Sequence, residues 1–148
     1  MTVKLINSYP SLTANDLNKV EAALGVVFPP VLRTMWLMSN GGVLDEERCV
    51  YQNDQYEFDI KYFLPVLHTK KEGILRVESL YKILTRDKEI LPETILPFAI
   101  DGGGFPFCIN ISNGTVHFAN LESQKIIYLE QDFDSFINNV ITEDEAWG

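Results

Sequence analysis

The sequence predicts an α+β protein in which two N-terminal helices, one middle helix and one C-terminal helix pack around a central antiparallel sheet. Apolar residues alternate on both sides of Asn113-Gly114, which is the pattern of a tight β-hairpin. Stripes of apolar residues at helical spacing lie before, between and after the strand patterns. Tight hairpins favour antiparallel pairing, so this order indicates the α+β class. The 148 residues suit one core, and we expect a single domain over residues 1–148.

Two helices are expected before the first strand. The first begins at the candidate N-cap Thr13 and ends at Gly25, a natural C′ residue. The second starts at Pro29-Pro30, because proline is tolerated in a first helical turn. Its apolar residues cover too wide a face for a surface helix, so we expect Trp36 in the core. The structural turn Asn40-Gly41-Gly42 ends this helix, since these residues accept positive φ.

The remaining elements follow from the same two periodicities. A middle helix is expected over residues 73–86. A final helix is expected from Asp132 or Asp134 to Ile141, followed by a frayed acidic tail over residues 143–148. Outside the hairpin, the strands are expected at residues 48–52, 56–62, 98–100 and 126–129.

The hairpin also predicts a register. A two-residue loop at positions 113–114 would place Ile111 opposite Val116 and Ile109 opposite Phe118. These pairs share one face of the sheet, which we expect to be the core face.

The run Asp101-Gly102-Gly103-Gly104 opens the hairpin, and we interpret it as a structural turn. Three glycines lose much backbone entropy on folding, which indicates a conformation that other residues resist. We expect positive φ in at least one of them. A phosphate cradle is the alternative, but a Walker-type loop needs a Lys-Ser/Thr pair and a following helix, and neither is present.

Composition and charge exclude several classes of protein. The hydrophobic fraction of 46% excludes a disordered chain, and no apolar run approaches the ~18 residues of a membrane span. The net charge is −9, and residues 89–148 contain ten acids against the single base Lys125. Such a surface repels nucleic acid and suits a cationic protein partner, although ordinary solubility charge would give the same balance. Without a signal-peptide pattern, we expect a cytoplasmic protein with reduced cysteines.

Few residues in the sequence suggest chemistry. Cys108 and His117 fall on one sheet face as diagonal neighbours, so they could act as a nucleophile and its base, but helices covering that face would give the same pattern. A zinc site from Cys49, His68, Cys108 and His117 lacks the usual ligand spacing. We therefore expect no catalytic residue, no metal site and no cofactor.

Several segments together resemble the signatures of the SUKH superfamily. A proline-started helix ends in an Asn-Gly-Gly turn, and a Leu-Pro-Phe-Ala segment leads into the glycine-rich turn. The segments that carry the resemblance are residues 28–42, 96–104, 113–117 and 134–136. One departure is Phe105, which stands where the family often has an acidic or polar residue directly after the glycines.

The resemblance implies an α+β fold and a non-enzymatic function. Many bacterial members of the superfamily are immunity proteins that neutralise the toxin domain of a polymorphic or contact-dependent toxin, often a nuclease. Fungal relatives regulate cell-wall synthesis and signalling. The leading hypothesis is therefore an immunity protein, the second is an intracellular regulatory or interaction module without a toxin partner, and the third is a small enzyme using Cys108 and His117.

The expected partner is a basic toxin protein that meets the acids of residues 45–59 and two later acids. Tyr56 and Tyr62 are the proposed anchors, although tyrosines alternating with acids also describe a strand whose aromatic face is core. We expect a monomer or a weak homodimer. The candidate partner-binding residues are Asp45, Glu46, Glu47, Asp54, Tyr56, Glu57, Asp59, Tyr62, Glu122 and Glu130.

Overall fold

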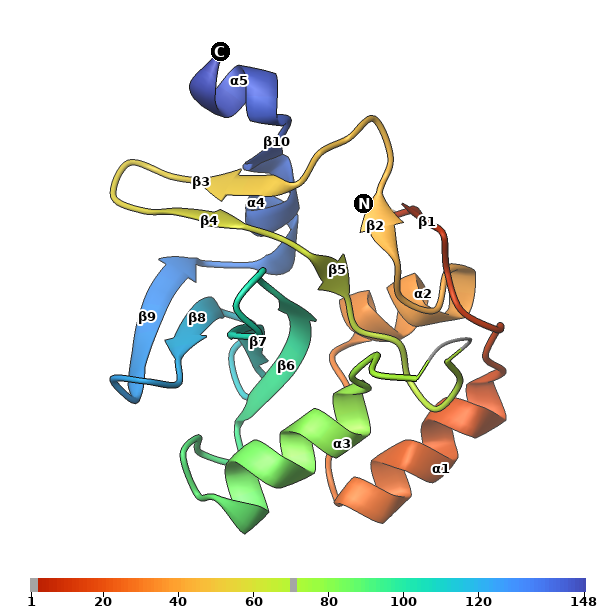
Figure 1. Cartoon of the computed structure of the whole chain (residues 1–148). Helices are drawn as coiled ribbons and strands as arrows, with labels where there is room; N and C mark the ends of the chain where they lie inside the picture. The colour runs from red at the N-terminus through yellow and green to blue at the C-terminus, as the bar shows by residue number, and fades with distance from the viewer. Residues whose placement is uncertain (1–2, 70–71) are drawn as a thin grey trace.

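The computed structural model describes residues 3–69 and 72–148 and confirms the α+β class (Figure 1). A five-stranded antiparallel sheet in the order β5-β6-β7-β8-β9 forms the centre, with β5 (Tyr62–Phe63), β6 (Ile95–Ile100), β7 (Pro106–Asn110), β8 (Val116–Asn120) and β9 (Lys125–Glu130). A smaller antiparallel sheet has the order β10-β3-β4, with β3 (Val50–Gln52), β4 (Glu57–Asp59) and β10 (Val140–Ile141). A separate pair joins β1 (Leu5–Ile6) and β2 (Val43–Leu44).

The helices lie around these sheets. In Figure 1, α1 and α3 occupy the end of the molecule opposite α5, and α4 lies between the small sheet and the central sheet. A short segment of wider helical turns, η1, continues α3. The bounds are α1 (Ala14–Leu24), α2 (Pro30–Met38), α3 (Val77–Lys82), η1 (Ile83–Asp87), α4 (Phe133–Asn138) and α5 (Glu143–Trp147).

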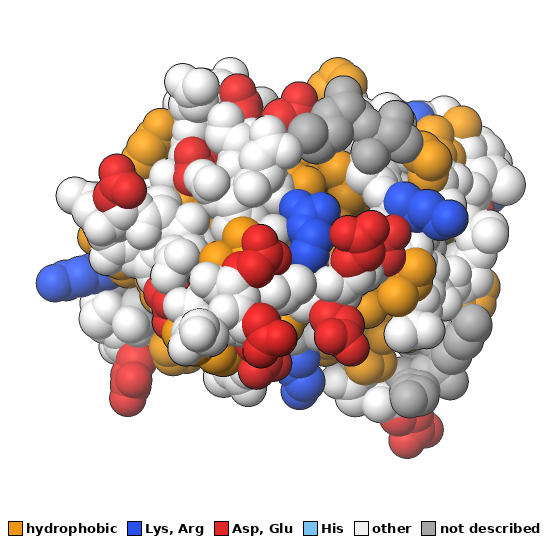
Figure 2. Space-filling model, turned by 90° about the horizontal axis from the view of Figure 1, so that it is seen from above, with side chains coloured by type: hydrophobic (Ala, Val, Ile, Leu, Met, Phe, Trp, Pro, Cys, Tyr) orange, Lys and Arg blue, Asp and Glu red, His pale blue; other side chains and the backbone are white. Residues whose placement is uncertain are grey.

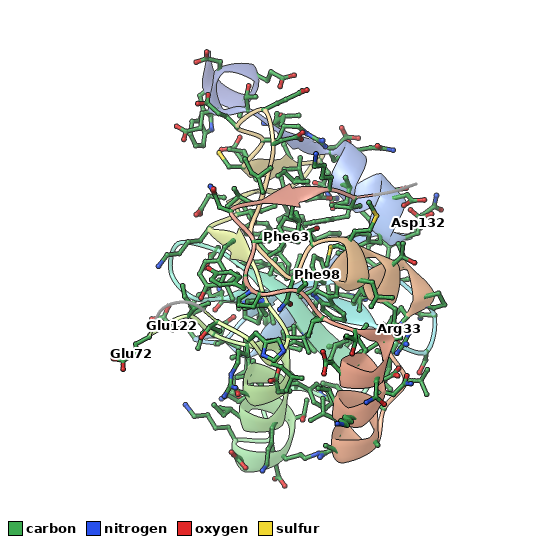
Figure 3. The ribbon with its side chains drawn as sticks, turned by 90° about the vertical axis from the view of Figure 1, so that its right-hand side faces the viewer. Arg33, Phe63, Glu72, Phe98, Glu122 and Asp132 are labelled. Atoms are coloured by element: carbon green, nitrogen blue, oxygen red, sulfur yellow. The ribbon has the colours of Figure 1, made fainter. Side chains whose placement is uncertain are left out.

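The predicted ends of α1 are confirmed. The Thr13 hydroxyl accepts a hydrogen bond from the backbone N–H of Asp16, and the Asp16 carboxylate accepts one from the backbone N–H of Thr13. This capping box satisfies two donors that the first helical turn leaves without partners. Gly25 ends the helix in the left-handed conformation, with φ of 72°. Arg33 on α2 binds Glu21 on α1 at 2.6 Å, which joins the two helices (Figure 3).

The second helix is less buried than predicted: Leu32, Met35 and Trp36 are buried, whereas Leu37 and Met38 are exposed. Trp36 is 0% exposed, and its indole N–H donates to the carbonyl of Leu64 at 3.2 Å. Its ring meets the ring of Phe28 edge to face, with 5.0 Å between the centroids. Asn40, just after the helix, is also buried, and its amide nitrogen donates to the carbonyls of Pro10 and Val66 at 2.9 Å each. The end of α2 therefore ties the N-terminal segment to the chain that follows β5.

The strand expected over residues 56–62 is divided between two sheets. Its first part is β4, which pairs with β3, and its last part is β5, which pairs with β6. The division falls at Ile60 and Lys61, where the N–H of Ile60 bonds to Cys49 and the N–H of Lys61 bonds to Ile100. The alternation of apolar and polar residues continues through this change of partner, so it could not reveal the break.

Two helix boundaries differ from the predictions. The middle helix begins at Val77 instead of residue 73, because Gly73 has φ of +83° and the N–H of Leu75 bonds to the hydroxyl of Tyr62. The final helix ends at Asn138, and the two residues Val140–Ile141 form β10 against β3. The predicted frayed tail is wrong, since these residues form α5.

The predicted hairpin register is wrong by two residues. Ile109 lies opposite Val116, and Phe107 lies opposite Phe118. The carbonyl of Asn110 accepts from the N–H groups of Asn113 and Gly114, which makes a four-residue loop where two residues were expected. An even shift keeps every side chain on its predicted face.

Aromatic rings fill the space between the central sheet, β4 and α4. Phe107 and Phe118 of the central sheet lie 5.1 Å apart, and Phe58 of β4 stacks on Phe118 at 4.0 Å. Phe136 of α4 contacts Phe98 and Phe107 at 5.3 and 5.5 Å. Among the described residues, nearly all buried hydrophobic side chains between Val3 and Val140 form one cluster.

The glycine-rich turn confirms the prediction of positive φ, which occurs at Gly104 (+86°). Gly104→Ala should lower the free energy of unfolding by about 1 kcal/mol, because alanine resists this conformation. A Cβ at Gly104 would meet nothing within 4 Å, so the effect is purely conformational. Gly103 has ordinary φ and room for a Cβ, so Gly103→Ala is the matched control. Equal denaturant midpoints for the two variants would contradict this account of the turn.

Candidate partner-binding face

The first three predicted acids lie in an exposed turn between β2 and β3. Glu46 and Glu47 both adopt left-handed backbone conformations, with φ of 57° and 58°, and the N–H of Arg48 bonds back to the carbonyl of Asp45 at 3.4 Å. Glutamate rarely adopts this conformation, so the turn holds two strained residues in sequence. Asp45, Glu46 and Glu47 are all exposed.

Helix α5 brings further acids to the same region. The hydroxyl of Thr142 accepts from the N–H of Glu145, and the carboxylate of Glu145 accepts from the N–H of Thr142, which fixes the start of the helix. Glu143 and Asp144 complete an acidic first turn, where the helix dipole favours negative charge. The indole N–H of Trp147 donates to the carboxylate of Glu57 on β4 at 2.6 Å. This bond holds α5 against the small sheet.

The turn, the strand β4 and the helix α5 together form one acidic face. Figure 2 looks onto this end of the molecule and shows several acidic side chains gathered around a few basic ones. A groove between the turn and α5 crosses the face and is lined in part by Glu47, Cys49, Lys61, Glu143 and Asp144. The acidic face is defined by eight carboxylates: Asp45, Glu46, Glu47, Glu57, Asp59, Glu143, Asp144 and Glu145.

The pKa of the Cys49 thiol is affected by carboxylates from all three elements of the acidic face. Partial burial raises the pKa of Cys49, and the negative charges of Glu143, Asp59 and Glu47 raise it further. One acid from each of the three elements therefore acts on a single side chain, so their charges add at the groove.

Two cations, Arg48 and Lys61, line the groove and offset part of the negative charge of the face. The guanidinium of Arg48 donates to the carbonyls of Val140 and Ile137 at 2.8 and 2.5 Å, so it stabilises the end of α4. Lys61 is exposed and lines the groove. The eight carboxylates outnumber these two cations, so the acidic face keeps an excess of negative charge.

Three of the predicted acids lie outside this face. Glu130 accepts hydrogen bonds from the hydroxyl of Tyr51 at 2.5 Å and from the amide of Asn139 at 2.7 Å, so it has a structural role. Asp54 and Glu130 line a separate polar groove between the β3–β4 turn and the end of β9. Glu122 lies in the turn between β8 and β9, far from α5 (Figure 3).

The two predicted tyrosine anchors are poorly placed for a partner. Tyr62 is 7% exposed, and its hydroxyl accepts from the N–H of Leu75, so its burial contradicts the expectation of an exposed anchor. Tyr56 is half-buried and stacks with Phe58. The exposed aromatic beside the acidic face is Trp147, at 59% exposure. Sequence reasoning missed it because it placed Trp147 in a frayed tail.

The glycine-rich turn has no N–H groups available for a phosphate. The carboxylate of Asp101 accepts from the N–H groups of Gly103 and Phe105, and its carbonyl accepts from Gly104. The carboxylate of Asp59 accepts from the N–H of Gly102 at 2.8 Å. These contacts support a structural role for the turn and show that Asp59 also anchors β4 to it.

Cys108 and His117 are directly opposite each other on β7 and β8. The thiol is fully buried, and this burial raises the pKa of Cys108. Burial also lowers the pKa of His117, whose Nε2 lies 2.7 Å from the hydroxyl of Thr115. A neutral, inaccessible thiol is not the thiolate that a cysteine nucleophile requires.

Within residues 3–69 and 72–148, no group of three or more His, Cys, Asp or Glu side chains could hold a metal ion. Over that same part of the chain, every helix is too short or too polar to cross a membrane.

The fold and the signature turns define a protein of the SUKH class. The chain belongs to the SMI1 / KNR4 family (SUKH-1), whose family model matches residues 11–139. A search of curated proteins found no match. The matched segment includes the turn of residues 45–48 and β4, whereas β10 and α5 follow it. Part of the acidic face is therefore built from residues outside the segment that the family model describes.

Proposed function

We propose that this chain is an immunity protein that binds and neutralises a cognate bacterial toxin domain with a basic surface. Membership of the SUKH-1 family supports a function in protein binding. The observation that carries the proposal is the acidic face, where one family-matched turn, one strand and a C-terminal helix bring eight carboxylates together.

The charge of this face suits a toxin that acts on nucleic acid. A nuclease must bind a polyanion, so its working surface is basic. An acidic inhibitor is attracted to such a surface over distances of about 10 Å, which accelerates association at low salt. Occupying that surface would also exclude the substrate, so inhibition needs no catalytic group in this chain.

Trp147 supplies the apolar contact that charge alone cannot provide. Tryptophan is strongly enriched among residues that dominate binding energy, especially where polar residues surround it. Here the indole N–H donates to the carboxylate of Glu57 at 2.6 Å, and Trp147 belongs to the acidic helix α5. We propose that acidic residues speed the encounter and that Trp147 slows dissociation.

Co-expression with a toxin tests the proposal. The toxin domain encoded beside the gene for this chain should arrest bacterial growth, and co-expression of this chain should restore it. A catalytically inactive toxin variant should form a stable complex with the chain, which separates binding from survival. Continued growth arrest in cells that contain the folded chain would refute the immunity function and leave the role of an interaction module without a toxin partner.

A further inference from the structure

The two edge strands of the central sheet, β5 and β9, differ in length and in whether other backbone covers them. At one edge, β5 is only two residues long, and Gly42 covers it through reciprocal backbone hydrogen bonds with Phe63 at 3.0 and 2.7 Å. At the other edge, β9 runs for six residues, and no strand pairs with its outer side in the part of the chain that the structure describes. Figure 1 shows β9 along the outer margin of the molecule.

The open edge is unusually apolar for an exposed strand. Ile126 is 37% exposed and Tyr128 is 54% exposed, although both lie between the charged ends of β9. The ring of Tyr128 is held edge to face against His117 at 5.6 Å, so the exposed surface is ordered. Proteins usually protect long edge strands with inward charges, prolines or a covering element, because free N–H and C=O groups invite another strand. Bulges also protect edges, and the pairing of β9 with β8 is irregular near Leu129, but residues 126–128 have none of these devices.

The charges at the two ends of β9 favour an antiparallel second copy of the same strand as its pairing partner. Each strand begins at Lys125 and ends at Glu130, so an antiparallel pair brings the basic end of one copy to the acidic end of the other. A parallel arrangement would place like charges together. The hydroxyl of Tyr51 and the amide of Asn53 bond to the carbonyl of Leu129, which holds the acidic end of the strand in place.

We infer that two copies of this chain pair antiparallel through β9, which joins their central sheets into one. A two-fold axis at Ile127 places Ile126 of each copy opposite Tyr128 of the second copy. These two residues lie on the same sheet face, so the axis continues that face across the dimer. An aromatic ring opposite a β-branched side chain is a favourable cross-strand pair.

The dimer should be weak and should tighten with salt. A six-residue strand buries less surface than a stable interface requires, and two chains of charge −9 repel each other. Sedimentation equilibrium of the purified chain in moderate salt should give a dissociation constant below about 1 mM. This inference is independent of the proposed immunity function, because the measurement uses no toxin.

Charge substitutions identify the strand that pairs. The double variant Ile126→Lys with Tyr128→Lys should be monomeric, and so should the double variant Ile126→Glu with Tyr128→Glu, because each places like charges opposite one another. An equimolar mixture of the two should form a heterodimer, since opposite charges then face each other across the axis. Fluorescence of the buried Trp36, read in a Trp147→Phe background, checks that both variants remain folded.

A matched control alters exposed apolar residues elsewhere. Val27 and Met38 are 76% and 55% exposed, so Val27→Lys with Met38→Lys should leave the dissociation constant unchanged. A wild-type chain that stays monomeric up to about 1 mM would overturn the inference. It would also be overturned by dimerisation of either charge variant alone, by failure of their mixture to associate, or by an equal loss in the control.

Discussion

Replacing Trp36 by alanine is expected to lower the free energy of unfolding by about 3–5 kcal/mol, the range for removing a large core aromatic. The side chain is 0% exposed, packs edge to face on Phe28 and donates to the carbonyl of Leu64. Alanine would leave both a cavity and a buried carbonyl without its donor. The hydrogen bond that joins α2 to Leu64, the residue after β5, would also be lost.

Denaturant titration followed by circular dichroism measures this change. At 148 residues the melting temperature should fall by roughly 6–20 °C, given 2–4 °C per kcal/mol for domains of this size. In a Trp147→Phe background, fluorescence reports Trp36 alone and should show the emission of a ring shielded from water. Emission typical of exposed tryptophan, or a loss under 1 kcal/mol, would contradict the burial described for Trp36.

Gly42→Ala is expected to lower the free energy of unfolding by about 3 kcal/mol or more, because strain and overpacking act together. Gly42 has φ of +115°, and a Cβ at this position would lie 2.2 Å from the carbonyl oxygen of Ile6. Backbone atoms cannot move aside as a side chain can. The displacement would break the β1–β2 pair and the hydrogen bonds between Gly42 and Phe63.

Gly25→Ala is the control that separates the two causes. Gly25 also has positive φ, +72°, but a Cβ there would meet nothing within 4 Å. This variant should therefore lose only about 1 kcal/mol. Equal losses for Gly25→Ala and Gly42→Ala in thermal unfolding would show that close packing at Gly42 contributes nothing.

Local signals in the sequence predicted the local structure well. Thr13, Gly25 and the prolines before α2 marked helix ends because caps and proline act within one helical turn. The hairpin register was missed, because Asn113-Gly114 does not reveal that the chain closes between Asn110 and Thr115. The division between β4 and β5 was missed for a similar reason, since the choice of pairing partner depends on distant strands.

The candidate site was only partly visible in the sequence. The acids of residues 45–59 were recognisable from charge alone, but their meeting with α5 depends on β10, which turns the chain back along β3. One available signal was overlooked. Thr142 and Glu145 have the spacing of a capping box, which predicts a helix start where a frayed tail was expected. The role of Trp147 beside Glu57 follows from that helix.

The most direct test of the account is kinetic. Glu57 and Asp59 hold hydrogen bonds within the fold, so the acids to neutralise are those that line the groove: Glu47→Gln, Glu143→Gln and Asp144→Asn. The matched control neutralises three exposed acids of η1 and the loop after it, at the opposite end of the molecule: Asp87→Asn, Glu89→Gln and Glu93→Gln. Each set removes three carboxylates and changes the net charge from −9 to −6.

Stopped-flow association with an inactive toxin domain should be measured from low to high salt. The groove variant should associate roughly tenfold more slowly than the parent at low salt and with a weaker salt dependence, because steering depends on local charge. The control variant should associate at nearly the rate of the parent, although its net charge equals that of the groove variant. Equal rates and equal salt dependence for the two variants would contradict the claim that the acidic face meets the toxin.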